Sequence, residues 1–153
     1  MGGCVGEKTV VVGMDGSGDA RSALMFAMEE AAMRRSLLRV VVAVRLPDYG
    51  LAGPRTITPP SPKELVDDVR EAAQTYVDEA VAARGDIADG LSVEVAVMFG
   101  HPGEVLCSSA AGAELLVVGH RGRGAVASAI IGSVGLHCVL HAGCPVVVVR
   151  PDA

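Results

Sequence analysis

The chain has 153 residues, of which 50% are hydrophobic and only 3% aromatic, and its formal net charge is −5 at pH 7. This length fits one domain with a full core. The negative charge and the lack of aromatic side chains for base stacking argue against a nucleic-acid-binding protein. No apolar run approaches the ~18 residues of a membrane span. We therefore expect a cytoplasmic protein that contacts neither nucleic acid nor membrane, with an N-terminal tail over residues 1–7 and one domain over residues 8–153.

The first half of the chain predicts two strands and two helices. Thr9–Val12 is an apolar, β-branched run typical of a buried strand, and Leu38–Val44 is another. Between them a stripe of period 3.6 predicts a helix, with Ser17 or Asp19 as its cap. The stripe consists of Ala20, Leu24, Ala27, Met28 and Ala31.

A long irregular segment, residues 46–61, holds four prolines and precedes a second predicted helix. Irregular segments of this length are usually functional or mobile. The helix is expected to begin at Pro62 and to end at a glycine cap near Gly85. Its predicted apolar stripe consists of Leu65, Val69, Ala72, Ala73, Tyr76 and Ala80.

The second half continues the alternation of strand and helix. Leu91–Phe99 alternates apolar and polar residues and predicts a half-exposed edge strand. A short helix is expected from His101 with Pro102 in its first turn, and another from Ser133 to a residue before Gly143. Leu115–Val118 and Val146–Val149 complete the strands. This alternation predicts a single-domain, doubly wound, Rossmann-like five-stranded parallel sheet with helices on both faces. We expect the strand order 3-2-1-4-5.

The most specific motif follows the fourth predicted strand, with glycines at positions 119, 122 and 132 and a serine at 133. Glycines allow close backbone approach, and the start of a helix attracts anions, so the motif predicts a site for nucleotide phosphates. Asp15 leaves the first strand towards the same predicted edge. Because a carboxylate suits a ribose hydroxyl or an adenine amino group better than a phosphate, we expect Asp15 to contact the nucleoside. Val118 and the pair Val42 and Ala43 are candidates for the apolar wall around the base.

Each of these patterns has an alternative interpretation. The glycine loop is also typical of a simple tight turn, and Asp15 of a helix cap. Arg121 and Arg123 suit either phosphate contacts or a solvated surface. His137 and His141 have a spacing that suits a metal, but no third ligand is evident, so we expect no metal site. The cysteines form no Cys-x-x-Cys pair and are expected to be reduced thiols, those at 107, 138 and 144 in the core.

From Lys8 to Pro151 the sequence resembles the universal stress protein family. The resemblance rests on Val11–Ser17, on the signature Gly-x2-Gly-x9-Gly-Ser beginning at Gly119, and on the tail from Gly132 to Val149. The glycine signature is that of the ATP-binding branch of the family. The resemblance implies a five-stranded parallel sheet that dimerises through its last strand and holds ATP, with or without Mg²⁺ as a counter-ion. It places Gly13 and Asp15 at the adenosine, Ala43 or its neighbour Val42 near the base with Val118, and Gly119, Gly122, Gly132, Ser133 and Val134 at the phosphates.

The sequence favours nucleotide binding without efficient turnover, and we assign no catalytic residue. It lacks the Gly-x4-Gly-Lys-Ser/Thr loop that would place a lysine on the β- and γ-phosphates, and its phosphate loop has no obvious water-activating carboxylate. We therefore expect a nucleotide-sensing regulatory module of the stress response. One alternative is a slow ATPase or self-phosphorylating enzyme, with Ser133 or Ser128 as acceptor. Another is a dimeric interaction scaffold that needs no nucleotide. The valine-rich last strand would be covered by a second copy in a homodimer.

Overall fold

A computed structural model describes residues 6–46, 60–122 and 130–151. Strands and helices alternate along it, as the sequence predicts. Most of the predicted irregular segment 46–61 lies outside the described residues. The elements are β1 (Thr9–Gly13), α1 (Gly18–Arg34), β2 (Leu37–Val44), α2 (Pro62–Ala83), α3 (Gly85–Ala88), β3 (Val93–Phe99), α4 (Pro102–Ser109), β4 (Leu115–Gly119), α5 (Ser133–His141) and β5 (Val146–Val149).

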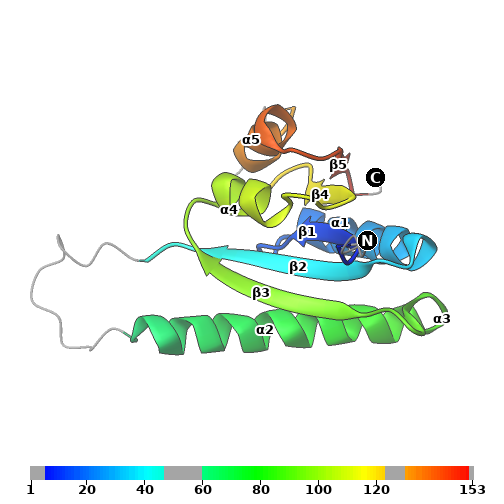
Figure 1. Cartoon of the computed structure of the whole chain (residues 1–153). Helices are drawn as coiled ribbons and strands as arrows, with labels where there is room; N and C mark the ends of the chain where they lie inside the picture. The colour runs from blue at the N-terminus through cyan, green and yellow to red at the C-terminus, as the bar shows by residue number, and fades with distance from the viewer. Residues whose placement is uncertain (1–5, 47–59, 123–129, 152–153) are drawn as a thin grey trace, which may run out of the picture.

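The strands form one parallel sheet in the order β3-β2-β1-β4-β5, which confirms the predicted order (Figure 1). Val12 of β1 pairs with Val40 on one side and with Val117 on the other. The chain therefore winds outward from β1 in one direction and from β4 in the other. The two strands leave the sheet side by side at this switch point, where doubly wound proteins bind ligands.

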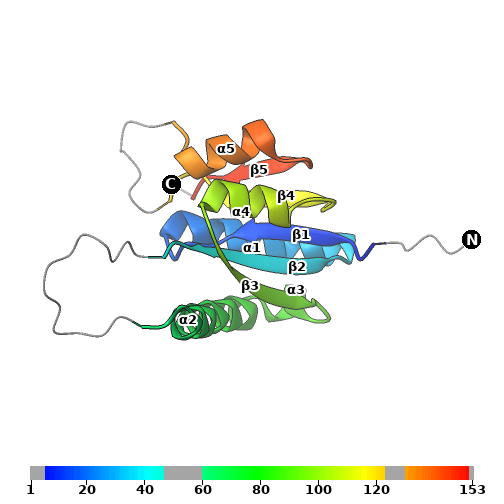
Figure 2. The same cartoon turned by 60° about the vertical axis from the view of Figure 1, so that its left-hand side comes forward.

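Helices cover both faces of the sheet (Figures 1 and 2). Helices α1 and α2 pack on one face, around a core that includes Leu24, Met28 and Val77. Helices α4 and α5 pack on the other, where Leu106 and Cys138 are buried. Successive residues of β1 alternate between the two cores, because side chains along a strand point to opposite faces.

The helix starts follow ordinary capping rules. Ser17 caps α1 and accepts the N–H of Ala20 at 3.1 Å, which decides between the two predicted caps. Helix α2 starts with a capping box in which Ser61 and Glu64 each accept the other's backbone N–H. The predicted stripe of α1 is buried throughout.

Two predictions for α2 are wrong. Gly85 is not its cap, because the helix ends at Ala83 with Arg84 as C-cap and Gly85 begins the short helix α3. Ala72 is exposed, and Val77 is buried instead. Adjacent residues on a helix lie about 100° apart, so the narrow buried stripe takes Ala73 and leaves Ala72 outside.

The last strand is less buried than predicted. All four valines of β5 are only partly buried, whereas β1 and β4 are almost fully buried. Strand β5 lies at the end of the sheet order and pairs with β4 alone. The expectation that this strand is buried on both faces is therefore wrong for the single chain.

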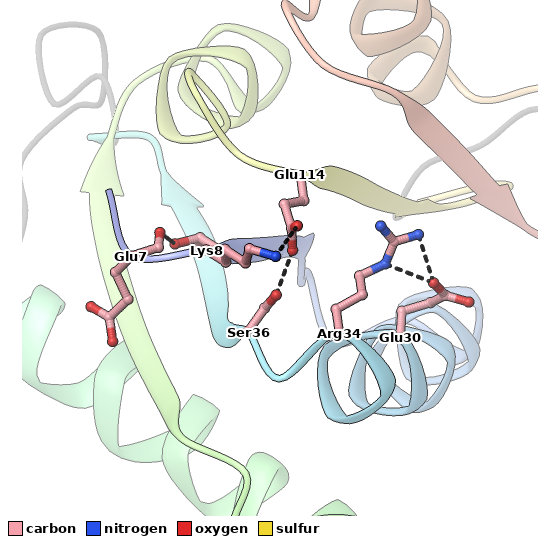
Figure 3. Close-up of polar contacts among 7 residues, drawn as sticks. Glu7, Lys8, Glu30, Arg34, Ser36 and Glu114 are labelled. Atoms are coloured by element: carbon pink, nitrogen blue, oxygen red, sulfur yellow. Dashed lines mark hydrogen bonds and ion pairs between the residues drawn. The ribbon is translucent and has the colours of Figure 1, made fainter. Parts of the chain in front are cut away.

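At the amino-terminal edge of the sheet, polar side chains connect the segments that lead into neighbouring strands (Figure 3). Glu114, just before β4, accepts the hydroxyl of Ser36 before β2, and its other oxygen lies 3.7 Å from the ammonium of Lys8 before β1. The starts of three neighbouring strands are thereby linked. Along the described ranges, no helix is both long and apolar enough to cross a membrane.

Candidate functional site

A cavity of about 400 Å³ opens at the carboxyl ends of β1, β2 and β4. It lies at the switch point between β1 and β4, where the sequence predicts the site. Nine of the residues predicted as ligand contacts line it: Gly13, Asp15, Ala43, Val118, Gly119, Gly122, Gly132, Ser133 and Val134. Val42, the alternative to Ala43, does not line it and packs on the other face of the sheet. Its wall also includes Met14, Ser17, Ala20, Val41, Arg45, Pro102, Leu106, Arg121 and Gly135.

The deep wall of the cavity is apolar and tightly packed. Val41, Val118 and Leu106 belong to the buried core between the sheet and helices α4 and α5. A Cβ atom at Gly13 would lie 2.8 Å from Cδ1 of Leu106, so a larger residue there would displace the Leu106 side chain at the end of β1. The wall therefore offers a preformed apolar slot of the kind that accepts a flat aromatic group.

The opposite wall is the start of α5. Gly132 is the N-cap of this helix and provides no side-chain cap, and its own N–H donates to the His120 carbonyl at 2.8 Å. One turn further on, the N–H of Leu136 donates to the Gly132 carbonyl at 3.0 Å. The N–H groups of residues 133–135 precede that bond, and all three residues line the cavity. Such a helix start attracts negative charge.

The loop after β4 differs from the prediction in which of its amides are available. The His120 N–H donates to the carbonyl of Val149 at 2.8 Å, and the Arg121 N–H to Oδ2 of Asp19, also at 2.8 Å. With the Gly132 amide also bonded, the lining amides of this region that have no partner among the described residues are those of Gly122 and of residues 133–135. The predicted phosphate site therefore has no free backbone amide at His120, Arg121 or Gly132.

The glycines of the motif make room for the protein's own backbone and side chains. A Cβ atom at Gly119 would lie 2.9 Å from the backbone carbon of Asp19. A Cβ atom at Gly122 would lie 2.7 Å from Oδ2 of Asp15. Neither glycine has a positive φ. The motif thus lets the end of β4 pack directly against the residues that join β1 to α1.

Asp15 lies at the cavity mouth but does not cap α1. Its Oδ1 accepts the N–H of Ser17 at 2.9 Å, an Asx turn that leads into the true cap. Its charge also reaches α2: burial raises the pKa of Tyr76, Arg21 opposes this and Asp15 adds to it. Asp15 and the start of α5 nevertheless line the same cavity at the carboxyl edge of the sheet, as the predicted contact with a nucleoside requires.

Two arginines give the cavity a positive balance. Arg45 and Arg121 line it together with a single carboxylate, that of Asp15, among the described residues. The Nε atom of Arg121 is buried without a hydrogen-bond partner in the described part of the chain, as is Nε2 of His120. Arg123, the other arginine considered for phosphate, lies outside the described residues. An unpaired guanidinium N–H beside a cavity favours an anionic ligand.

Asp19 is the functional residue that the sequence did not reveal. We predicted it only as an alternative cap, yet its carboxylate holds the loop 102 residues further along the chain. Its position in the first turn of α1 explains either role, because a carboxylate is favourable there in both cases. No local sequence pattern indicates a hydrogen bond between two residues so far apart in the chain.

The remaining titratable side chains gather on α4 and α5. The rings of His137 and His141 lie 4.5 Å apart, but the described residues contain no group of His, Cys, Asp or Glu arranged to hold a metal. Burial, with additions from Cys107 and Cys144, raises the pKa of Cys138 to about 12. This thiol is therefore protonated at neutral pH and behaves as a core residue.

The fold is that of a doubly wound α/β protein with a cavity at its switch point. Comparison with known proteins gives the family. The model of the Universal stress protein family matches residues 7–150, and the chain belongs to this family.

Two curated relatives show how the chain compares in length. A universal stress protein of Mycobacterium tuberculosis is 32% identical over 145 residues, which cover 94% of this chain and 48% of the relative. One from Thermus aquaticus is 34% identical over 146 residues, which cover 94% of this chain and 98% of the relative. The chain therefore spans about half the length of the mycobacterial relative and nearly all of the Thermus one.

Solved structures share the fold. A universal stress protein in complex with cAMP has a TM-score of 0.63 at 22% identity, covering 95% of this chain and 98% of its own. One from Archaeoglobus fulgidus in complex with dAMP has a TM-score of 0.60 at 22% identity, covering 92% and 96%. One from Arabidopsis thaliana with AMP bound has a TM-score of 0.55 at 20% identity, covering 95% and 93%.

Proposed function

We propose that this protein binds an adenine nucleotide, with ATP as its main ligand, in the cavity between β1, β4 and α5. The observation that carries the proposal is the start of α5, where three backbone N–H groups without side-chain caps line the cavity. Phosphate groups are the natural ligands of such a helix start. Ser133 adds a hydroxyl donor beside them.

The nucleoside end of the ligand is assigned to the opposite part of the cavity. Ala43 and Val118 would hold the base against the apolar slot, and Asp15 would accept a hydrogen bond from the ribose or from the adenine amino group. Three proteins with this fold are named for complexes with cAMP, dAMP and AMP. Those ligands share an adenine base, a pentose and a phosphate, the three parts that we assign to this cavity.

We further propose a regulatory rather than a metabolic role. Among the described residues that line the cavity there is one carboxylate and no lysine. Fast phosphoryl transfer depends on several positioned charges around the reacting phosphate. A bound nucleotide would instead stabilise one state of the protein, which is how a nucleotide-sensing module of the stress response would act. Mg²⁺, if it enters, would do so as a counter-ion of the phosphates.

Mass spectrometry of the small molecules that co-purify with the protein tests the ligand, followed by calorimetry with ATP, AMP and GTP. We expect an adenine nucleotide in the purified sample and weaker binding of GTP. Gly122→Leu should abolish this binding, because its side chain would collide with Asp15. If no adenine nucleotide binds, or if Gly122→Leu binds ATP as well as the wild type does, the proposal fails and the scaffold alternative gains support.

We also propose that the partner at β5 is a second copy of the chain. The free edge of β5 and its four partly buried valines would be covered by a twin strand related by a two-fold axis. The apolar residues Leu136, Val139 and Leu140 of α5 are 46%, 52% and 66% exposed near this edge.

Proline substitutions can test the two edges of β5 one at a time, because proline removes a backbone N–H donor. The carbonyls of Pro145 and Val149 face β4, so by alternation the N–H of Val147 also faces β4 and that of Val148 faces the free edge. Val148→Pro should therefore give a folded monomer in light scattering, while Val147→Pro should destabilise the sheet itself. A wild-type monomer, or a Val148→Pro dimer, would refute this assignment.

A further inference from the structure

Arg121 occupies an unusual position on the cavity wall. It lines the cavity, and its Nε is buried without a partner among the described residues. A guanidinium on a cavity wall can bind a phosphate oxygen through charge-assisted hydrogen bonds. Besides Arg45 and Asp15, the remainder of the described wall offers mainly backbone amides, hydroxyls and apolar groups, which distinguish less sharply between a charged and a neutral ligand.

The backbone of Arg121 is held in place by α1. Oδ2 of Asp19 accepts the Arg121 N–H at 2.8 Å. Two residues earlier, Gly119 packs so closely on the Asp19 backbone that a Cβ atom would approach it to 2.9 Å. These two contacts fix the residues at the end of β4 relative to the first turn of α1.

The carboxylate of Asp19 lies near the proposed phosphate site, where its negative charge would repel a phosphate. An anion-binding site is expected to keep such a carboxylate only if it has another function. The bond from Asp19 to the Arg121 N–H supplies one, because the carboxylate stabilises the loop that carries the guanidinium. The net effect of Asp19 on an anionic ligand is then favourable only if this positioning outweighs the repulsion. If Asp19 acts by positioning Arg121, removing it should weaken the binding of an anionic ligand. If Asp19 acts only through its charge, removing it should strengthen that binding.

We propose that Arg121 makes this site select phosphorylated adenine ligands over adenosine, and that Asp19 is the positioning residue that holds Arg121 against the cavity. The proposal rests on the proposed function. The guanidinium binds a phosphate oxygen of the nucleotide. Adenosine, which carries no phosphate, gains nothing from it.

The first test is the ratio of the adenosine Kd to the AMP Kd, measured by calorimetry. Arg121→Gln should lower this ratio about tenfold by weakening AMP while adenosine stays within about twofold, as expected for loss of a charge-assisted hydrogen bond. Arg34→Gln removes the same charge from the far end of α1, where Arg34 pairs with Glu30, and should leave the ratio unchanged (Figure 3).

The outcomes separate the two claims. If the wild type binds neither AMP nor adenosine, the proposed function itself fails. If the wild type binds both and Arg121→Gln weakens both equally, or Arg34→Gln lowers the ratio as much, only the role of Arg121 is overturned.

The second test compares Asp19→Asn with Asp19→Ala. The amide oxygen of asparagine can still accept the Arg121 N–H, so Asp19→Asn should keep the selectivity ratio and Asp19→Ala should lower it about as far as Arg121→Gln does. Asp67→Ala, at an exposed carboxylate paired with Lys63 on α2, controls for loss of charge. If the two Asp19 variants give the same ratio, or if both bind AMP more tightly than the wild type, Asp19 acts through its charge and the positioning role is wrong.

Discussion

Helices α1 and α5 both begin at the cavity, and they begin differently. The Ser17 side chain caps α1 and satisfies one of its first amides, whereas α5 starts at Gly132 without any side-chain cap. Helix α1 also buries a full stripe of six residues, from Ala20 to Ala31, while α5 buries only Gly135 and Cys138. A helix start that is completed by its own chain serves the fold, and one left incomplete beside a cavity is available to a ligand.

The largest expected effect concerns the contact that joins the two regions. Gly119→Ala places a methyl group 2.9 Å from the backbone of Asp19, which a side-chain rotation cannot relieve. We expect a loss of about 2 kcal/mol in the free energy of unfolding, within the range for overpacking. Urea denaturation measures it. Gly18→Ala in the first turn of α1 is the matched control, because a Cβ atom there meets nothing within 4 Å, and it should not be destabilised.

Completing the start of α5 should remove the difference between the two helices. Gly132→Asp would supply a cap and a negative charge at this N-cap, with its Cβ about 3.4 Å from its nearest neighbours. The capped helix should be as stable as the wild type or slightly more so, but ATP affinity should fall at least about tenfold through competition and repulsion. Calorimetry of the variant decides; unchanged ATP affinity would show that the phosphates do not bind at this helix start.

Substitutions of Ser17 and Ser133 also compare the start of α1 with the start of α5, with smaller expected effects. Ser17→Ala removes the cap of α1 and should cost about 1 kcal/mol of stability. Ser133→Ala, at the first position of α5, should leave stability within about 0.5 kcal/mol and weaken ATP binding several-fold. Thermal melts with and without ATP measure both. An equal loss of stability in both variants would mean that Ser133 contributes to the fold of the free protein.

The last prediction concerns how α5 is anchored. Because the pKa of Cys138 is raised to about 12 in the folded protein, from an ordinary value of 9.0, the folded state retains a proton that the unfolded state loses. Stability from this thiol is complete below pH 9 and declines as the pH rises from there towards 12. Urea denaturation at about pH 8 and about pH 10 should show the decline, and Cys138→Ala, though less stable overall, should show less of it. An identical decline in the variant would assign the effect to other groups.

The sequence predicted the architecture and the strand order, since long apolar runs and helical stripes are strong local signals. The sequence also predicted many of the residues that line the cavity. The ends of parallel strands meet at one edge of a sheet, and the glycine signature resembles that of a known family. It failed where neighbouring positions competed, as at Ala72, or where a contact spans the chain, as from Asp19 to Arg121. The glycines were interpreted as room for a ligand, whereas Gly119 and Gly122 are required by Asp19 and Asp15. Such requirements arise only after distant segments have packed.

The peptide groups of His120 connect two places that are otherwise separate. Its N–H is bonded to Val149 at the end of β5, and its carbonyl receives the N–H of Gly132. A movement of the outermost strand would therefore reach the start of α5 through two consecutive hydrogen bonds. If nucleotide and partner both stabilise this arrangement, occupancy and self-association must strengthen each other by the same factor. Dimer dissociation constants measured with and without AMP would reveal that reciprocity, and equal values would show that the two events are independent.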